Sequence, residues 1–464
     1  MNDRLSRRRF LARAAGATGG LVLTAVAASG SPAAAAVSAG SPGSPGATGG
    51  GSDSRSVGRP PSQLASTELL AWFDQLYRQV KAERFSPPAA ARAHGHILVA
   101  AYEMVAVGSP HLRSLGGQLN GFGPQPRRSL AINWLVAVNE AIAVAADAVF
   151  ADRSDGARQV LAGYAADRRA ALTSGLPAPV VERSLVEGRS VGRAVAGRAN
   201  ADGYLGTLGR PYSPPVGPDK WVRTPPNFGA AIEPFWGEVQ AFALASNDEC
   251  KPIPPVPYSE EVGSPFWTQA NVVYETSFAV TDQQRQLALF WRDNPDGSTG
   301  LPSGHWLAIA ATVIADQGLM LDRAAEIMAL TAIATADGFT SCWTEKYETN
   351  LLRPVTYVQR IIDPSWNTFV NSPAFPEYTS GHSVGSGAAS AMLTHLLGDG
   401  VGFIDTIGRQ NGHPDQTYRS FREAAEEAAL SRLWGSIHYP MGIEEGLVQG
   451  RHVAELLIGR LHTR

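Results

Sequence analysis

Residues 375–382 read Phe375-Pro376-Glu377-Tyr378-Thr379-Ser380-Gly381-His382, a turn that runs directly into the apolar stretch from Ser383 to Leu397. The apolar stretch is predicted to be a helix, with Ser380 at its N-cap. The first backbone N–H groups of such a helix point towards a bound anion. Gly381 lets the backbone approach that anion closely, and His382 can exchange a proton at its edge. Taken alone, the string also fits a capped helix with a structural histidine.

Two cations precede this turn. Lys346 and Arg353 are seven residues apart, or about two helical turns, which predicts both side chains on one helix face. Pro354 is predicted to end or kink that helix. Arginine offers an oxyanion a fork of hydrogen bonds, and lysine offers a point charge. Cations on a helix face are usually only solvated, so this pair does not identify a site by itself.

A third string follows the turn. It reads Ser431-Arg432-Leu433-Trp434-Gly435-Ser436-Ile437-His438-Tyr439-Pro440. Arg432 offers another anion-binding group, whereas His438, six residues on, would face away from it on a straight helix. Gly435 and Pro440 predict that the helix breaks between them, so that His438 can turn inwards. In isolation this string also describes a helix end with an exposed arginine.

The three strings occur in the order Lys-x6-Arg-Pro, Ser-Gly-His and Ser-Arg-x5-His. This ordered set resembles the signature of the superfamily that vanadium-dependent haloperoxidases share with type 2 phosphatidic acid phosphatases and bacterial acid phosphatases. The matching region runs from Lys346 to His438, roughly a fifth of the chain. Each string is ambiguous alone, but the ordered set is specific, because a chance match of all three is very improbable.

The resemblance implies a pocket for a tetrahedral oxyanion, either vanadate or phosphate. The residues that would bind it are Lys346, Arg353, Ser380, Gly381, Arg432 and His438. In a haloperoxidase His438 would bond the vanadium of vanadate, and in a phosphatase it would attack phosphorus. His382 would be the catalytic acid/base, acting on bound peroxide or on the leaving group.

Two aromatic residues favour one branch of this superfamily. Trp343 lies three residues before Lys346, and Phe375 lies seven residues before His382. The pair is similar to one in fungal-type chloroperoxidases that packs beside the vanadate and shapes the halide site. Bromoperoxidases tend to have histidine at the Phe375 position. The resemblance therefore makes Trp343 and Phe375 the candidate halide-site residues.

Three functions follow from the resemblance. The first is an exported vanadium-dependent haloperoxidase-type enzyme, which oxidises halide with hydrogen peroxide at a protein-bound vanadate and serves a small organic acceptor. The alternative is a soluble acid phosphatase of the same superfamily, with His438 as nucleophile and phosphate in place of vanadate. The third is a non-catalytic oxyanion-binding protein, against which the intact seven-residue set argues.

Two further features bear on the signature. The string Leu301-Pro302-Ser303-Gly304-His305-Trp306 also contains Ser-Gly-His, but it precedes the first cation and is therefore in the wrong order. We interpret His305 as structural or as lining the site entrance. Many relatives have an aspartate four residues after the last histidine, where it orients the imidazole; here that position is Gly442. Glu444 or Glu445 is the candidate substitute, and the missing aspartate leaves the choice between vanadate and phosphate open.

Helical periodicity dominates the chain beyond residue 62, whereas alternating β-branched runs are scarce. Helices are predicted from about 67 to 80, at 88–107, 129–151, 156–174 and 179–200. The helical pattern resumes at about Ser264, with strong segments at 281–293, 304–318, 321–350, 382–397, 418–433 and 443–462. The segment from Tyr204 to about Pro265 is dense in proline and glycine, and we expect a long crossover there. We therefore predict an all-α fold of two helical bundles over 63–464. The resemblance implies that this is a vanadium chloroperoxidase-like domain, with the anion site in 321–464.

The N-terminus predicts export. Ser6-Arg7-Arg8-Arg9-Phe10-Leu11 precedes an apolar, glycine-rich stretch and a small-residue cleavage region, as in a twin-arginine signal over 1–39. Residues 40–62 are rich in glycine, serine and proline and read as a disordered linker. We expect a secreted or extracytoplasmic protein without a stable membrane anchor, and a homodimer is a candidate assembly.

Composition excludes some other classes. The net charge is -3 and the chain is not strongly basic, so nucleic acid is not an expected partner. The two cysteines, Cys250 and Cys342, are far apart and predicted to be buried singly rather than to bind a metal. His94 and His96 flank a glycine in an alanine-rich helical stretch and are interpreted as packing residues.

Overall fold

The computed structural model describes residues 58–125 and 131–464. The chain divides into a unit of Met1–Asp53, which lies outside these residues, and a unit of Ser54–Arg464, which contains every element described below. The predicted twin-arginine signal and the linker up to residue 57 also lie outside the described residues. Among the helices of the described ranges, none is long and apolar enough to cross a membrane.

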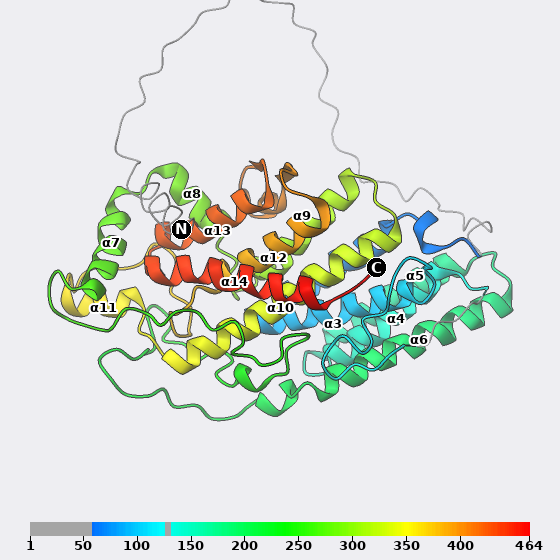
Figure 1. Ribbon diagram of the computed structural model, residues 1–464, viewed down its shortest axis with the longest axis horizontal. Helices are drawn as coiled ribbons and strands as arrows, with labels where there is room; N and C mark the ends of the chain where they lie inside the picture. Colours follow the sequence, from blue (N-terminus) through cyan, green and yellow to red (C-terminus); the bar gives the residue numbers. More distant parts are fainter. Residues whose placement is uncertain (1–57, 126–130) are drawn as a thin grey trace, which may run out of the picture. The chain divides into compact units, whose positions relative to one another are not determined.

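Helices make up most of the described residues (Figure 1). The α-helices are α2 Thr67–Ala82, α3 Pro87–Ala106, α4 Trp134–Val149, α5 Asp155–Thr173, α6 Ala178–Ala201, α7 Pro265–Ala279, α8 Asp282–Phe290, α9 Leu301–Asp316, α10 Leu321–Thr349, α11 Pro354–Ile361, α12 Gly381–Leu397, α13 Phe421–Trp434 and α14 Pro440–Arg460. Short 3₁₀ turns are η3 Pro61–Gln63, η4 Tyr204–Thr207, η5 Trp236–Glu238 and η6 Ile407–Asn411. The strands β1 Phe403–Asp405 and β2 Gln416–Tyr418 pair antiparallel, with Phe403 opposite Tyr418. The predicted all-α class is confirmed.

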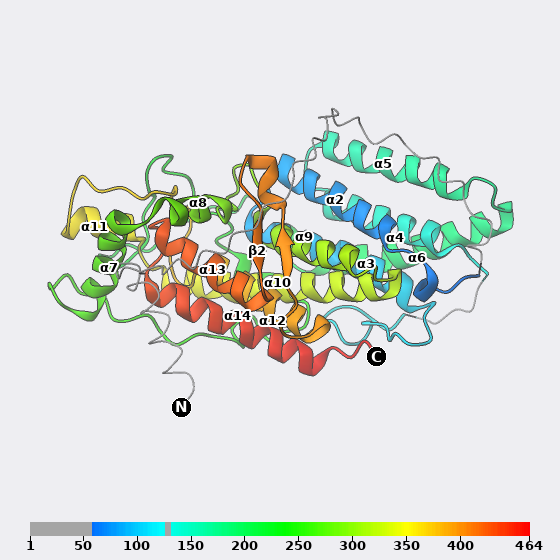
Figure 2. The same cartoon turned by 90° about the horizontal axis from the view of Figure 1, so that it is seen from above.

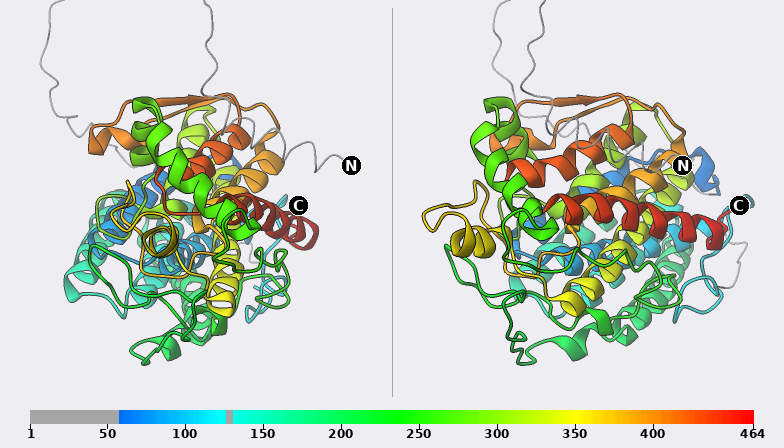
Figure 3. Two further views of the ribbon diagram at one scale, coloured as in Figure 1. Left: turned by 90° about the vertical axis from the view of Figure 1, so that its left-hand side faces the viewer. Right: turned by 60° about the vertical axis from the view of Figure 1, so that its left-hand side comes forward.

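The long helix α10 connects two groups of helices (Figures 1 and 2). In the first group α4 packs against α3, α5 and α6, and α3 also packs against α10. In the second group α12 packs against α10, α13 and α14, while α7 and α8 contact α13 (Figure 3). These groups correspond to the two predicted bundles. Every residue of α3 is buried, because this helix is covered by neighbours on all sides.

Two glycines allow α12 and α14 to lie in close contact. A Cβ atom on Gly450 would be 2.1 Å from the carbonyl oxygen of Val384, and one on Gly387 would be 2.7 Å from that of Leu447. A side chain at either position would therefore push the two helices apart. The first turns of these helices are also joined, since the Ser380 N–H donates to the Gly442 carbonyl at 2.9 Å. This contact brings the Ser-Gly-His string beside the segment that contains His438.

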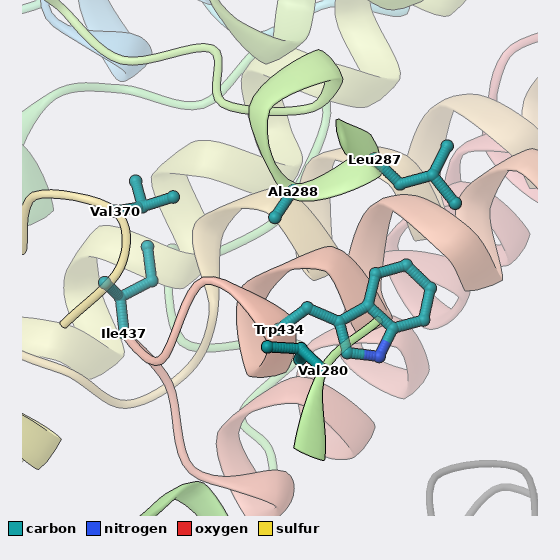
Figure 4. Close-up of a cluster of buried hydrophobic side chains, with 6 residues drawn as sticks. All are labelled: Val280, Leu287, Ala288, Val370, Trp434 and Ile437. Atoms are coloured by element: carbon teal, nitrogen blue, oxygen red, sulfur yellow. The ribbon is translucent and has the colours of Figure 1, made fainter. Parts of the chain in front are cut away.

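A buried apolar cluster holds the loop between α13 and α14 against α8. Its members are Val280, Leu287, Ala288, Val370, Trp434 and Ile437 (Figure 4). Ile437 is 1% exposed and directly precedes His438 in the chain. The cluster thereby anchors the backbone from which the His438 side chain projects.

Most predicted helices are found within a few residues of the expected bounds. α4 starts at Trp134 rather than 129, where the Asn133 side chain accepts a hydrogen bond from the Val136 N–H. The helix α11 and the hairpin of β1 and β2 were not predicted, because each is too short to show a clear period. His94 and His96 are fully buried, as expected of packing residues. Both cysteines are buried and free.

Candidate anion site

The three strings converge on one region of the second helical group. Lys346 lies near the end of α10, and Ser380 caps α12 ahead of Gly381 and His382. Arg432 lies near the end of α13, and His438 lies in the loop before α14. The residues that line a narrow cavity here include Phe339, Trp343, Phe375, Gly381, His382, Ile437 and His438. Of the predicted set, Gly381, His382 and His438 line this cavity. Ser380 directly precedes Gly381, and Lys346, Arg353 and Arg432 lie behind the wall, in contact with Phe375, His438 and His382, respectively.

Lys346 is fully buried against the turn that precedes α12. Its Nζ donates to the carbonyl oxygens of Pro376 (3.0 Å), Glu377 (2.9 Å) and Thr379. Burial lowers the pKa of this ammonium group to about 8. The lysine therefore fixes the shape of the turn and places a positive charge beside the cavity.

Arg353 reaches the same region by a different route from the one predicted. α10 ends at Thr349, Asn350 adopts a left-handed conformation with φ of 48°, and Arg353 is the N-cap of α11. The two cations are thus not on one helix face, and Pro354 begins a helix instead of ending one. Proline is well suited to this first helical position, because it has no N–H to leave unpaired.

The Arg353 guanidinium is held by backbone groups around the cavity. Nε donates to the Phe375 carbonyl at 2.8 Å, and Nη1 donates to the Ile437 carbonyl at 3.1 Å and to His438 Nε2 at 3.2 Å. Nη2 is buried and has no partner among the described residues. A buried N–H group without a partner is rare, and an oxyanion in the cavity would satisfy it.

Arg432 and His382 are both anchored to the chain segment that leaves α8. Arg432 donates to the carbonyl oxygens of Ala288 (3.2 Å) and Arg292 (3.3 Å), and its Nη1 lies 3.4 Å from His382 Nε2. His382 is also hydrogen-bonded to the backbone at Trp291 and Arg292. Burial, with the nearby Arg432 charge, holds the pKa of His382 well below 6.5. His382 is therefore neutral and can accept a proton.

His438 is held in one tautomer. Its Nδ1 lies 2.7 Å from Glu377 Oε1, and when Glu377 is ionised this oxygen can only accept, so Nδ1 carries the proton. Nε2 receives a hydrogen bond from Arg353 and has its lone pair directed towards that side. Burial and the charges of Arg353 and Lys346 hold the pKa of His438 well below 6.5. A neutral imidazole can serve as a ligand or as a nucleophile through the Nε2 lone pair, in exchange for the hydrogen bond from Arg353.

The carboxylate partner of His438 is not one that the sequence predicted. Glu377 Oε1 accepts from His438 Nδ1 and from the Tyr439 N–H at 3.0 Å, and the Glu377 side chain is fully buried. The expected substitution by Glu444 or Glu445 is therefore wrong. Burial raises the pKa of Glu377 to about 7, against the effect of the neighbouring Lys346 and Arg353 charges.

The two candidate halide-site aromatics lie together at the cavity wall. The ring centroids of Trp343 and Phe375 are 4.9 Å apart, and Lys346 Nζ lies 5.7 Å and 5.1 Å from them, respectively. Trp343 Nε1 donates to the Ile232 carbonyl at 3.3 Å, which fixes the indole. Both rings are buried and face the cavity that His382 and His438 also line.

His305 lies behind the cavity in a buried clamp. Its Nδ1 bonds Asp293 Oδ2 at 2.8 Å and its Nε2 bonds Asp405 Oδ2 at 2.7 Å, while its ring stacks on Trp291 at 4.3 Å. Burial alone lowers the pKa of His305, but the two carboxylates outweigh it and raise the pKa to about 10. Asp293 lines the cavity, whereas His305 does not. His305 is thus structural, as one of the two interpretations had it.

A second cavity, of about 190 Å³, opens beside the first, and we call it the vestibule. The two cavities share Asn294, Pro295 and Pro373 as lining residues. Two loops, 224–232 and 371–374, form most of the vestibule wall, and the Ile232 N–H donates to the Ala374 carbonyl at 2.9 Å between them. Among the described residues that line it, there is no lysine, arginine or histidine.

Sequence reasoning missed Glu377, Asp293 and Asp405. Glu377 lies within residues 375–382, where it is the one acidic residue before Ser-Gly-His. A single acid in an otherwise uncharged turn could have indicated a partner for a site histidine. Asp293 and Asp405 lie 12 and 100 residues from His305 in the chain, and no spacing rule relates residues so far apart.

Comparisons with known proteins identify the family and related folds. A family model, the second helical-bundle domain of VCPO, matches residues 326–463. The crystal structure of a bacterial vanadium-dependent iodoperoxidase is similar over 86% of this chain and 97% of that chain, with a TM-score of 0.81 and 34% sequence identity.

Two further structures are similar in fold. The apo form of a bacterial vanadium-dependent chloroperoxidase aligns with a TM-score of 0.59 and 17% identity, over 80% of this chain and 93% of that chain. The holo form of a bacterial vanadium-dependent chloroperoxidase aligns with a TM-score of 0.58 and 16% identity, over 86% of this chain and 92% of that chain. A search of curated proteins found no match.

Proposed function

The chain belongs to the vanadium-dependent haloperoxidase family, and from this premise we propose that it oxidises halide with hydrogen peroxide at a protein-bound vanadate. The observation that carries the proposal is a cavity lined by two neutral histidines, with three buried cations in contact with its lining residues. Hydrogen peroxide, one proton and a halide ion would give hypohalous acid and water. Two electrons pass from the halide to the O–O bond, which breaks.

The donor set around the cavity fits vanadate. Lys346, Arg353 and Arg432 bring positive charge to a buried region, and Nη2 of Arg353 has no protein acceptor. His438 offers Nε2 as the vanadium ligand, while Ser380 and the Gly381 amide lie at the start of α12, where N–H groups favour an anion. When bound, vanadate supplies a Lewis acid that activates peroxide without changing its own oxidation state.

His382 is the residue that would move protons. The Nε2 lone pair of its neutral ring accepts a hydrogen bond from Arg432, and in exchange for this hydrogen bond it would take a proton from hydrogen peroxide. Its anchoring to the backbone at Trp291 and Arg292 fixes the ring orientation. The proton is then available for the hypohalous acid or the water that forms.

The Trp343 and Phe375 rings are proposed to contact the halide. Their buried surface gives a poorly hydrated environment, which favours a large, weakly hydrated anion such as iodide, while Lys346 supplies the compensating charge. The relative that is 34% identical is an iodoperoxidase, so iodide is the first halide to test. Bromide and chloride should be tested in the same way.

The phosphatase alternative gains support from one observation. Gly442 stands where many relatives have the aspartate that orients the histidine, but Glu377 orients His438 instead. His438 can therefore act as a nucleophile as well as a ligand. A single assay on the purified protein separates the two functions. The protein is loaded with orthovanadate, and halide oxidation with peroxide is measured beside hydrolysis of an aryl phosphate.

Halide turnover that requires vanadate is the expected result of this assay. Phosphate release that vanadate inhibits, without halide turnover, would overturn the proposal in favour of the acid phosphatase. Binding of vanadate with neither activity would favour a non-catalytic oxyanion-binding protein.

We propose that the vestibule receives the small organic acceptor, an electron-rich aromatic compound without negative charge. Ala374→Leu should reduce its volume and raise the KM for such an acceptor by roughly 10-fold, through lost apolar contact and steric overlap. Oxidation of iodide to triiodide without acceptor should be unchanged, because the anion site is untouched. An equal effect on both reactions would contradict this assignment and indicate damage to the adjacent Phe375.

Export by the twin-arginine pathway is also proposed, on the Ser-Arg-Arg-x-Phe-Leu match at residues 6–11. Replacing Arg7 and Arg8 by lysine in a bacterial host with this pathway should leave the full-length precursor inside the cell. Fractionation and immunoblotting of wild type and variant measure this. Equal export of both proteins would exclude this pathway.

A further inference from the structure

We infer that Glu377 and Gly442 form a reciprocal pair, in which the acid that orients His438 comes from the turn before α12 and Gly442 leaves the space for it. The inference rests on the proposed role of His438 as the residue that meets the oxyanion. It identifies Glu377 as a positioning residue for the reaction, and it explains why a glycine stands where many relatives have aspartate.

The hydrogen bonds define the role of Glu377. One oxygen, Oε1, accepts from both His438 Nδ1 (2.7 Å) and the Tyr439 N–H (3.0 Å). The carboxylate therefore fixes the imidazole and the backbone that carries it. With the proton held on Nδ1, the lone pair of His438 remains on Nε2, on the side where Arg353 also lies.

Glu377 connects the histidine to the lysine of the site as well. Its carbonyl oxygen accepts from Lys346 Nζ at 2.9 Å, and its N–H donates to the Leu351 carbonyl at 2.9 Å. A single residue thus positions the ligand histidine through its side chain and one cation through its backbone. A carboxylate from α14 would orient His438 without this second connection.

The space at Gly442 supplies the independent observation. A Cβ atom built on Gly442 would lie 2.5 Å from Glu377 Oε1 and 3.0 Å from Oε2, closer than real Cβ contacts allow. The backbone there cannot shift easily, because the Gly442 carbonyl accepts from the Ser380 N–H and its own N–H donates to the Tyr439 carbonyl. The Glu377 carboxylate therefore occupies the place that any side chain at 442 would need.

The test moves the carboxylate that orients His438 from position 377 to position 442. The variants are Glu377→Gln, Glu377→Ala, Gly442→Asp and the double variant Glu377→Ala/Gly442→Asp, with Glu445→Gln as a matched buried-glutamate control. The primary measurement is the ¹⁵N NMR tautomer signature of the His438 ring in vanadate-free protein. The second is the Kd for orthovanadate, and circular dichroism checks the fold of each variant.

We expect Glu377→Ala to give mixed tautomers of His438 and to weaken vanadate binding by roughly 10- to 100-fold, the range for loss of a residue that orients a metal ligand. The double variant should restore the single tautomer and most of the affinity. Gly442→Asp alone should destabilise the fold, since two carboxylates would then compete for one buried place. Glu377→Gln should show a partial effect, and the control should match wild type.

The inference is overturned if Glu377→Ala keeps the wild-type tautomer and affinity, or if the folded double variant is no better than Glu377→Ala. The tautomer signature needs neither halide turnover nor bound vanadate. A failure of the proposed haloperoxidase activity would therefore leave this result readable, and the two failures are distinguishable.

Discussion

Replacing His438 by alanine is expected to abolish halide oxidation, with kcat/KM falling by roughly 10³-fold or more, as when a central member of a catalytic constellation is removed. Nε2 of this imidazole is the proposed vanadium ligand, and contacts with Arg353 and Glu377 hold the ring in position. The cations would remain, so vanadate affinity should fall less than turnover does.

Steady-state kinetics with iodide and peroxide, after loading with vanadate, measure the loss. A second measurement of vanadate binding separates a lost ligand from a lost site. His452→Ala is the matched control, since His452 is an exposed histidine of α14. Full activity of His438→Ala would show that this histidine is not the axial residue, and it would contradict the proposed site.

Removal of His438 does not separate the haloperoxidase from the acid phosphatase. A nucleophilic histidine is required for phosphoryl transfer in that branch, so the variant should be inactive in either chemistry. The discriminating evidence therefore comes from the wild-type assays, and the variant establishes only which residue both chemistries share.

The structure corrects the predicted geometry of the two cations that precede the turn. Lys346 and Arg353 were placed on one helix face because they are seven residues apart, yet Asn350 ends α10 between them with a left-handed conformation. Both side chains still lie against the Phe375 ring at the cavity wall, with Lys346 Nζ 5.1 Å and the Arg353 guanidinium 4.8 Å from its centroid. Spacing within a short string cannot show where a helix stops when a tertiary contact decides it.

The inward turn of His438 was predicted from its neighbours and is confirmed. α13 ends at Trp434, Gly435 is its C-cap, and Ser436 has a φ of 65°. Glycine and proline act locally, so their effect on the chain can be anticipated from sequence. The partner of His438 could not be anticipated in this way. Glu377 lies 61 residues away in the chain, and only the packing of α12 on α14 brings the two residues together.

The second large effect expected concerns stability. Replacing His305 by alanine should lower the free energy of unfolding by about 3–5 kcal/mol at pH 7, because Asp293 and Asp405 would lose the cation between them in a buried region. His305 is 1% exposed and bonds both carboxylates, so water does not replace it readily.

The pH dependence of this loss identifies the charge on His305. The pKa of His305 is raised in the folded protein, from 6.5 to about 10, so its stabilisation is complete below pH 6.5 and is lost as the pH rises through 10. Between pH 7 and pH 9.5 the difference between wild type and His305→Ala should shrink by about 3 kcal/mol. Urea unfolding followed by circular dichroism at the two pH values measures it.

His94→Ala is the matched control for this experiment. His94 is also fully buried, but burial lowers its pKa to about 4, so it is neutral in both the folded and the unfolded protein from pH 7 to 9.5. The loss of unfolding free energy in His94→Ala should therefore be the same at pH 7 and at pH 9.5. If His305→Ala behaved like this control, the clamp would be a set of neutral hydrogen bonds, and Asp293 would face the anion cavity without a buried cation behind it.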